Sequence, residues 1–270
     1  MKFTVLTVAL AFFWFLCPTV AGPPDTLTNS NVPPTELTVK TEIEYFPRNV
    51  VTGPKAWAVA CCALLVETNR GWHDTLPIKP INSSSVQTRK ESLDEWWGIK
   101  NKADLTRILC WLETDGHRAQ FQKLGRQLQT LNFVEFTLLL RKTTDRDRLN
   151  ELRIAREYYP KLGKKSLVGW DFCRAIFLCR AAYECGYISE NEAWYHIMVY
   201  AQYLQQTFDS WEDLGRNYII GRQFWSSKRT HENGSDFNDI YMRLLETPSS
   251  PWNTLDWNMD LLNSEARDEK

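Results

Sequence analysis

The chain has 270 residues, of which 43% are hydrophobic and 24% charged, with 12 glycines and 12 prolines. This composition excludes disordered, collagen-like and low-complexity proteins, and it provides enough apolar material for a sizeable core. The formal net charge is −1 and the lysines and arginines are scattered, so the sequence carries no basic stripe and we expect no nucleic-acid partner.

The first 22 residues have the layout of a secretory signal. Lys2 precedes an apolar run from Phe3 to Leu16, and Pro18 and small residues follow the run. The run is too short to predict a membrane span, so we expect cleavage after position 21 or 22 and no stable membrane span afterwards. The mature protein would be secreted or periplasmic, whereas an uncleaved segment would leave it tethered to a membrane.

The segments that follow predict an all-α protein with a single globular domain. Residues 23–53, rich in Pro, Thr and Asn, are expected to form an irregular arm, residues 54–257 a domain of about eight helices, and residues 258–270 a polar tail. Apolar spacing and end signals predict helical segments, in chain order, over 54–69, 88–97, 102–115, 117–141, 145–159, 167–185, 189–208, 211–225 and 235–246.

Cysteines allow two interpretations. An exported chain without Cys17 keeps six of them, at Cys61, Cys62, Cys110, Cys173, Cys179 and Cys185. Disulfides are possible in an oxidising compartment, but cysteines six apart on one helix are separated by roughly 9 Å along its axis and cannot pair. Buried reduced thiols are the alternative. No Cys/His spacing indicates a metal site, and no glycine-rich loop indicates a phosphate-bearing cofactor, so we predict neither.

Residues 166–225 are the most informative stretch, because they place charges where a helix usually buries carbon. On the predicted helix 167–185, Asp171 and Arg174 share a mainly apolar face, and Arg180 and Glu184 point about 130° away from them. One solvent-facing stripe does not accommodate both pairs. We therefore expect one pair to be buried or to line a cleft, and we favour Asp171 and Arg174 because their face is the more apolar.

A further arginine lies among aromatic residues on the predicted helix 211–225. Arg222 shares a face with Trp211, Tyr218 and Trp225. A guanidinium in such a place needs a carboxylate, a stack of aromatic rings or both, and Asp171 is the candidate partner. The bland interpretation of these charges is an internal ion-pair network that fixes helix register. The bland interpretation of the abundant tryptophans is that they are large side chains that fill the core.

Glu192 and His196 form a second candidate pair, one turn apart on the predicted helix 189–208. A Glu–His pair can transfer protons. Glu192 also completes a capping box with Ser189, so the pairing is more simply structural.

The chain resembles a known family, the DUF1266 domain proteins, which are known mainly from bacteria. The resemblance covers roughly residues 54–257 and implies a single helical domain, but it implies no reaction. The signal peptide and the cysteines depart from the usual family pattern. The resemblance rests on Trp97-Gly98-Ile99, Gly116-His117-Arg118, Trp170-Asp171, Arg174, Gly186-Tyr187-Ile188-Ser189, Glu192-Ala193-Trp194, Ser210-Trp211, Tyr218, Gly221-Arg222, Trp225 and Pro251-Trp252.

These features predict an exported, non-catalytic helical module that binds an unidentified protein or small molecule. Its pocket would form around Asp171, Arg174 and Arg222, with Trp170, Trp194, Tyr218 and Trp225 as further ligand-binding candidates.

The alternative is an exported hydrolase or toxin-like enzyme. It would use Asp171 or Glu192 as the base and His117 or His196 as the acid or base. Arg174 and Arg222 would stabilise negative charge in the transition state. These groups would have to converge in one open cleft.

Overall fold

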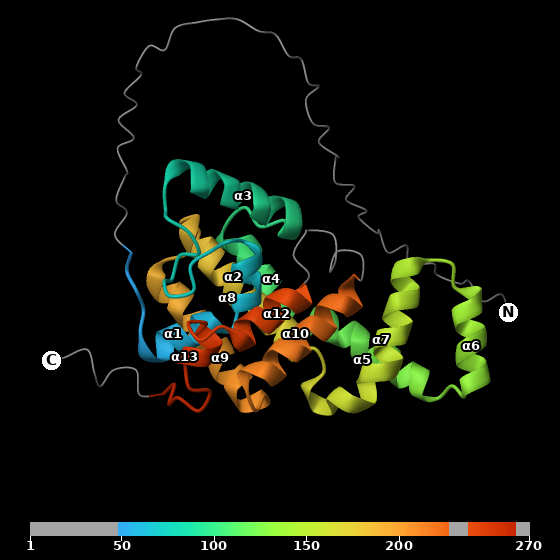
Figure 1. Cartoon of the computed structure of the whole chain (residues 1–270). Coiled ribbons are helices and arrows are strands. Elements are labelled where there is room, and N and C mark those ends of the chain that lie inside the picture. Colours follow the sequence, from blue (N-terminus) through green and yellow to red (C-terminus); the bar gives the residue numbers. More distant parts are fainter. Residues whose placement is uncertain (1–47, 227–236, 263–270) are drawn as a thin grey trace, which may run out of the picture. The chain divides into compact units, whose positions relative to one another are not determined.

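Helix α8 (Val168–Glu184) is buried along its whole length, and only Tyr183 among its residues is even partly exposed. A helix that is enclosed on all sides has to be covered by its neighbours. Three helices pack closely against it and lie beside it in Figure 1: α4 (Lys102–Thr114), α9 (Glu190–Thr207) and α10 (Trp211–Trp225).

The structure is a computed structural model that describes residues 48–226 and 237–262, all within one compact unit. Every regular element in these residues is a helix, which confirms the predicted fold class; Val50 and Thr75 pair in an isolated antiparallel bridge. The predicted signal, most of the arm and the end of the tail lie outside the described residues. Within them, no helix combines the length and apolarity needed to span a membrane.

Two predicted helices are divided, and several boundaries move. Residues 54–69 break at Cys61 and Cys62, and residues 117–141 break before Asn132. At the second break, Asn132 and Glu135 accept each other's backbone N–H and start a new helix. The other helices are α1 (Gly53–Ala60), α2 (Ala63–Thr68), α3 (Ser83–Trp97), α5 (Gly116–Gln129), α6 (Phe133–Lys142), α7 (Arg146–Leu162), the 3-10 helix η1 (Gly163–Lys165), α12 (Phe237–Glu246) and α13 (Pro251–Thr254).

Four tryptophans join the two ends of the described chain. The Trp57 ring of α1 lies 4.6 Å from that of Trp211 and 5.0 Å from that of Trp257, measured between centroids. Trp252 stacks on Trp211, and its Nε1 donates to the carbonyl of Ala60 at 3.0 Å. These indoles fill the core, as the bland interpretation of the tryptophan content expected.

Both charged pairs on α8 are buried, so the expectation that only one of them would be is wrong. Arg180 is 0% exposed and donates to the carbonyls of Trp72, Thr75 and Leu76 at 2.7–3.0 Å and to the Cys62 sulfur at 3.2 Å. The loop between α2 and α3 supplies these carbonyls. Arg180 thus attaches that loop to α8.

Glu184 attaches two further segments to α8. Its Oε2 accepts from Nε of Arg89 on α3 at 2.7 Å, and its Oε1 accepts the backbone N–H of Lys79 at the same distance. The arrangement of residues around α8 could not show that both pairs are buried, because the segments that cover Arg180 and Glu184 lie about 100 residues earlier in the chain. These segments are α3 and the loop that precedes it.

The six described cysteines are all free thiols, and five of them are buried. Burial raises the pKa of the Cys61, Cys62, Cys173 and Cys179 thiols, and it raises that of Cys185 to about 11. Cys110 on α4 is the exposed one. The reduced alternative therefore fits the structure, and the disulfide candidates do not pair.

We predict that, of the six described thiols, only that of Cys110 reacts promptly with an aromatic disulfide reagent in the native protein. Thiolates are the reacting species, and burial both shields the other thiols and keeps them protonated. After unfolding in guanidinium without a reductant, all six should titrate. A lower count in the unfolded chain would reveal a disulfide and contradict the structure.

Candidate functional site

The carboxylate of Asp171 caps the N-terminus of α5, although the residue belongs to α8. Its Oδ1 accepts the backbone N–H of His117 at 3.1 Å, and its Oδ2 accepts that of Arg118 at 3.2 Å. The N-cap residue of α5, Asp115, provides no side-chain cap. N–H groups in the first turn of a helix have no acceptor within that helix. The Asp171 carboxylate accepts from two of them and places its negative charge at the positive end of the α5 dipole.

Gly116 makes this contact possible. Its φ is +54°, and a Cβ built on it would lie 2.1 Å from Oδ2 of Asp171. Any side chain at this position would displace the carboxylate from the helix end. Two of the segments that carry the family resemblance, Gly116-His117-Arg118 and Trp170-Asp171, therefore meet at one contact.

Arg174 is the second member of the cluster. Its Nη2 donates to Oδ1 of Asp171 at 2.6 Å and to Nδ1 of His117 at 2.9 Å, and its Nε donates to the Trp170 carbonyl at 2.9 Å. Its guanidinium carbon lies 4.0 Å from the ring centroid of Trp170 and 5.3 Å from that of Trp97. The predicted burial of Asp171 and Arg174 as a pair is correct.

Arg118 is the third charged member and the most exposed of the three, and the neighbouring His117 ring also reaches the surface. Nη1 of Arg118 donates to Oδ2 of Asp171 at 3.0 Å and to the carbonyl of Leu112, and its Nη2 donates to the carbonyl of Glu113. Its side chain is 16% exposed, against 0% for Asp171 and 6% for Arg174. One buried carboxylate thus neutralises part of the charge of two arginines.

The protonation states follow from burial and these charges. Burial by itself would raise the pKa of Asp171, but hydrogen bonding by His117 and the charge of Arg174 hold that pKa below its ordinary value. Burial lowers the pKa of His117, and the charge of Arg174 lowers it further. At neutral pH the imidazole is uncharged, which suits Nδ1 as the acceptor of the Arg174 hydrogen bond.

Arg222 does not form the predicted pair with Asp171, whose oxygens are taken by Arg118, Arg174 and two backbone N–H groups. Its guanidinium lies instead over aromatic rings, 4.3 Å from the centroid of Phe237. The aromatic half of the prediction is therefore correct.

Two of the three rings predicted around Arg222, Tyr218 and Trp225, both lie against Trp170; the third, Trp211, packs against Trp57, Trp252 and Trp257 instead, so its predicted place beside Arg222 is wrong. Trp225 is 5.1 Å from the Arg222 guanidinium and 6.1 Å from Trp170, whose ring is 4.9 Å from that of Tyr218. Burial raises the pKa of Tyr218, and its hydroxyl has no hydrogen-bond partner in the part of the chain that the structure describes.

The remaining candidates lie apart from this cluster. Glu192 caps α9 through Ser189 and forms an ion pair with Lys102, and these contacts lower its pKa to about 2. The rings nearest to His196 are Tyr195 and Tyr200 on its own helix. Trp194 lies under the ammonium group of Lys55, and its Nε1 donates to Glu190. Among the described residues, no three His, Cys, Asp or Glu side chains form a potential metal site.

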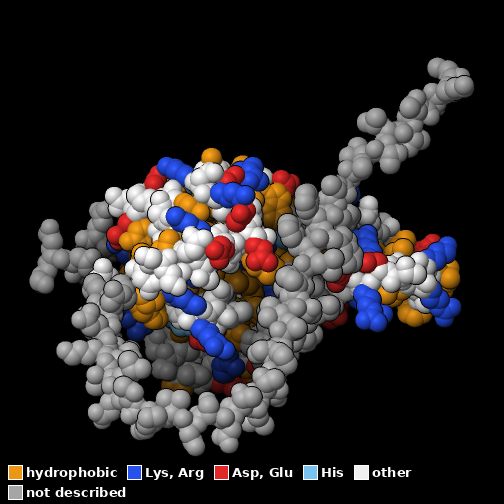
Figure 2. Space-filling view, turned by 90° about the horizontal axis from the view of Figure 1, so that it is seen from above, with side chains coloured by type: hydrophobic (Ala, Val, Ile, Leu, Met, Phe, Trp, Pro, Cys, Tyr) orange, Lys and Arg blue, Asp and Glu red, His pale blue; other side chains and the backbone are white. Residues whose placement is uncertain are grey.

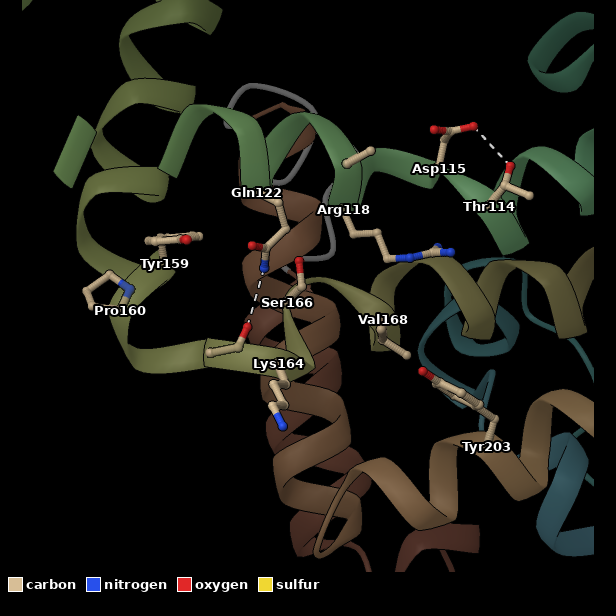
Figure 3. A pocket seen from close by; sticks show the side chains of 12 residues that line it. Thr114, Asp115, Arg118, Gln122, Tyr159, Pro160, Lys164, Ser166, Val168 and Tyr203 are labelled. Atoms are coloured by element: carbon tan, nitrogen blue, oxygen red, sulfur yellow. Dashed lines mark hydrogen bonds between the residues drawn. The ribbon is translucent and has the colours of Figure 1, made fainter. Parts of the chain in front are cut away.

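An open groove of about 690 Å³ borders the cluster, and Arg118 belongs to both (Figure 3). It is bounded by the start of α5, the end of α7, the turn that leads into α8, and α9. Gln122 crosses one end, where its Nε2 donates to the Gly163 carbonyl at 3.3 Å. The other side chains used below are Asp115, Tyr159, Lys164, Ser166 and Tyr203.

Sequence reasoning did not select these groove residues. Arg118 belongs to Gly116-His117-Arg118, one of the segments that carry the family resemblance, but nothing in the sequence distinguishes it from its neighbours as a groove residue. Ser166 has a φ of +45°, which is unusual for a residue with a side chain and cannot be read from a Lys-Lys-Ser segment. Both residues gain their positions only from the packing of α5 and α8.

The fold and the cluster define an all-helical domain built on a buried charged helix. The family described as "Protein of unknown function (DUF1266)" matches residues 92–257, and the chain belongs to this family. The predicted domain begins at residue 54, earlier than this match does. Helices α1 and α2, which precede residue 92, pack against the same core.

Two curated relatives carry no assigned activity. The uncharacterized protein YbeR of Escherichia coli (strain K12) is 23% identical over 186 residues, which cover 61% of this chain and 75% of YbeR. The uncharacterized protein YbeU of the same organism is 25% identical over 144 residues, which cover 53% of this chain and 60% of YbeU. No solved structure matches the chain.

We predict that Asp171→Asn lowers the free energy of unfolding by about 3 kcal/mol or more, because it leaves two largely buried guanidinium groups without their counter-charge. Glu192→Gln, which alters an exposed cap and ion pair, should have a clearly smaller effect. Urea unfolding followed by circular dichroism measures both. Equal losses in the two variants would show that Asp171 is no more important than a surface cap.

We further predict that His117→Gln reduces the loss of stability between pH 7 and pH 5. The pKa of His117 is lower in the folded than in the unfolded chain, so its contribution is complete above about pH 6.5 and declines below it. Gln keeps an acceptor for Arg174 but does not titrate. Asp171 retains its contribution down to about pH 4, because its folded pKa lies below the unfolded value of about 3.9. Identical pH profiles of wild type and variant, from denaturant midpoints, would contradict this assignment.

Proposed function

We propose that the protein is a non-catalytic binding module whose ligand occupies the groove beside Arg118. The observation that carries this proposal is the contrast between the two neighbouring regions. The Asp171 carboxylate is enclosed and both of its oxygens are hydrogen-bonded, whereas the adjoining groove is open and lined by polar and aromatic side chains. The cluster acts as the fixed wall of the site.

The wall is held rigidly enough to serve a binding site. Arg118 makes three hydrogen bonds to its own surroundings before any ligand arrives. The two tyrosines of the groove rest on core rings, Tyr203 at 5.1 Å from Phe172 and Tyr159 at 6.3 Å from Phe121. Side chains that are already fixed lose little conformational entropy on binding. The groove suits a ligand with an aromatic or apolar body, such as a small molecule or the side chain of a peptide.

The burial of Asp171 argues against the alternative, a hydrolase or toxin-like enzyme. A general base has to come within hydrogen-bonding distance of the proton that it removes. Asp171 is 0% exposed, and Nδ1 of His117 is occupied by Arg174. Glu192 lies apart from both and is engaged with Ser189 and Lys102.

We also propose that the module is exported. The charged, apolar and small-residue segments of positions 1–22 support this. The mass of the mature chain after expression in its native host tests it: a start near position 22 or 23 is expected, and a retained apolar segment would indicate a membrane-tethered protein.

We predict that small aromatic probes perturb the groove and that Tyr203→Ala weakens their binding at least about fivefold. The matched control is Tyr195→Ala, because Tyr195 is also on α9, is 69% exposed and does not line the groove. The measurement is a titration of the ¹⁵N-labelled protein with benzyl alcohol and benzoate by NMR. Equal effects of the two substitutions, or no shifts near Arg118 and Tyr203, would contradict the groove as the binding site.

A further inference from the structure

We propose that the end of the groove at Ser166 binds an oxyanion group, a carboxylate or a phosphate, carried by an organic ligand. This inference rests on the proposed function of the groove and adds the chemical class of its ligand. Three observations carry it: an unpaired buried hydroxyl, a helix N-terminus whose N-cap residue has no side-chain acceptor, and a local excess of positive charge.

The hydroxyl of Ser166 is the first observation. Ser166 is 4% exposed and lines the groove, and its Oγ has no hydrogen-bond partner in the residues that the structure describes. Figure 3 shows the hydroxyl directed towards the side of the groove formed by Gln122 and Arg118. A buried hydroxyl normally has a partner, because an unsatisfied one destabilises the fold. A ligand oxygen in the groove would supply that partner.

The start of α8 is the second observation. Ser166 lies two residues before the first residue of this helix of 17 residues, and the N-cap residue, Leu167, offers no side-chain acceptor. Asn217 fixes the turn by accepting from the Gly169 N–H at 2.9 Å and donating to the Ser166 carbonyl at 2.7 Å. Asn217 therefore caps one first-turn N–H group of α8, and the helix dipole still places a partial positive charge at this end, which favours anions.

Side-chain charge is the third observation. Arg118 uses three of its five N–H groups within the protein and is part of the groove wall. Lys164 adds a positive charge at the rim, although its ammonium points away from Arg118 in Figure 3. Asp115 opposes an anion, but its carboxylate accepts from Thr114 and lies at the far end of the groove from Ser166. The charge of Asp171 is shared by Arg118 and Arg174.

The backbone of Ser166 allows a discriminating pair of variants. With φ at +45°, a glycine would adopt this conformation more readily than serine does. Ser166→Gly removes the hydroxyl and relieves the backbone, and Ser166→Ala removes the hydroxyl alone. If the hydroxyl serves only a ligand, neither variant should melt below wild type, and Ser166→Gly should melt higher.

The experiment titrates wild type and both variants with benzoate, phenyl phosphate and benzyl alcohol in a buffer free of phosphate and carboxylate. At least one anion should bind wild type at least about tenfold more tightly than neutral benzyl alcohol, and the two anions together identify which oxyanion the site prefers. Both variants should lose about fivefold or more in affinity for that anion. Their affinity for benzyl alcohol should not change.

Equal binding of the anions and benzyl alcohol to wild type, or unchanged anion binding by the Ser166 variants, would overturn the oxyanion site and leave the groove function standing. A lower melting temperature in both variants would also overturn it, because the hydroxyl would then be structural. If none of the three probes binds near Arg118 and Tyr203, both this inference and the proposed function fail.

Discussion

The rest of the structure depends on one interaction, the capping of α5 by the carboxylate of Asp171. It is a tertiary cap: the carboxylate comes from α8, and the helix end that it satisfies lies more than 50 residues earlier. The contact fixes where α5 begins, and it requires the glycine at position 116. It also draws Arg118 and Arg174 to the same carboxylate, one facing the groove and the other the aromatic core.

Burying so many charges on one helix is tolerable because each has a specific partner. Asp171 accepts from two arginines and two backbone N–H groups, Arg180 donates to three carbonyls, and Glu184 pairs with Arg89. Removing one partner from such a set is far more damaging than exchanging a surface charge. These contacts hold the α2–α3 loop, α3 and α5 around α8. The face seen in Figure 2, by contrast, has Lys and Arg interspersed with Asp and Glu.

Much of the fold was predictable because local signals agree with the tertiary structure. The three central helices start and end within two residues of their predicted limits, since Ser189 and Ser210 are strong caps and Gly186 follows the end of α8. The failures came from contacts between distant segments. No pattern along one helix shows that a remote loop covers Arg180, or that Asp171 meets Arg118 rather than Arg222.

Hydrogen exchange at the backbone amides of His117 and Arg118 tests the central claim most directly. First-turn amides usually exchange quickly, because no carbonyl of their own helix accepts from them. If the Asp171 carboxylate caps α5 from α8, these two amides should exchange nearly as slowly as amides in the middle of α8, and the protection should vanish in Asp171→Asn. Exchange as fast as at the exposed first turn of α7 would contradict the account.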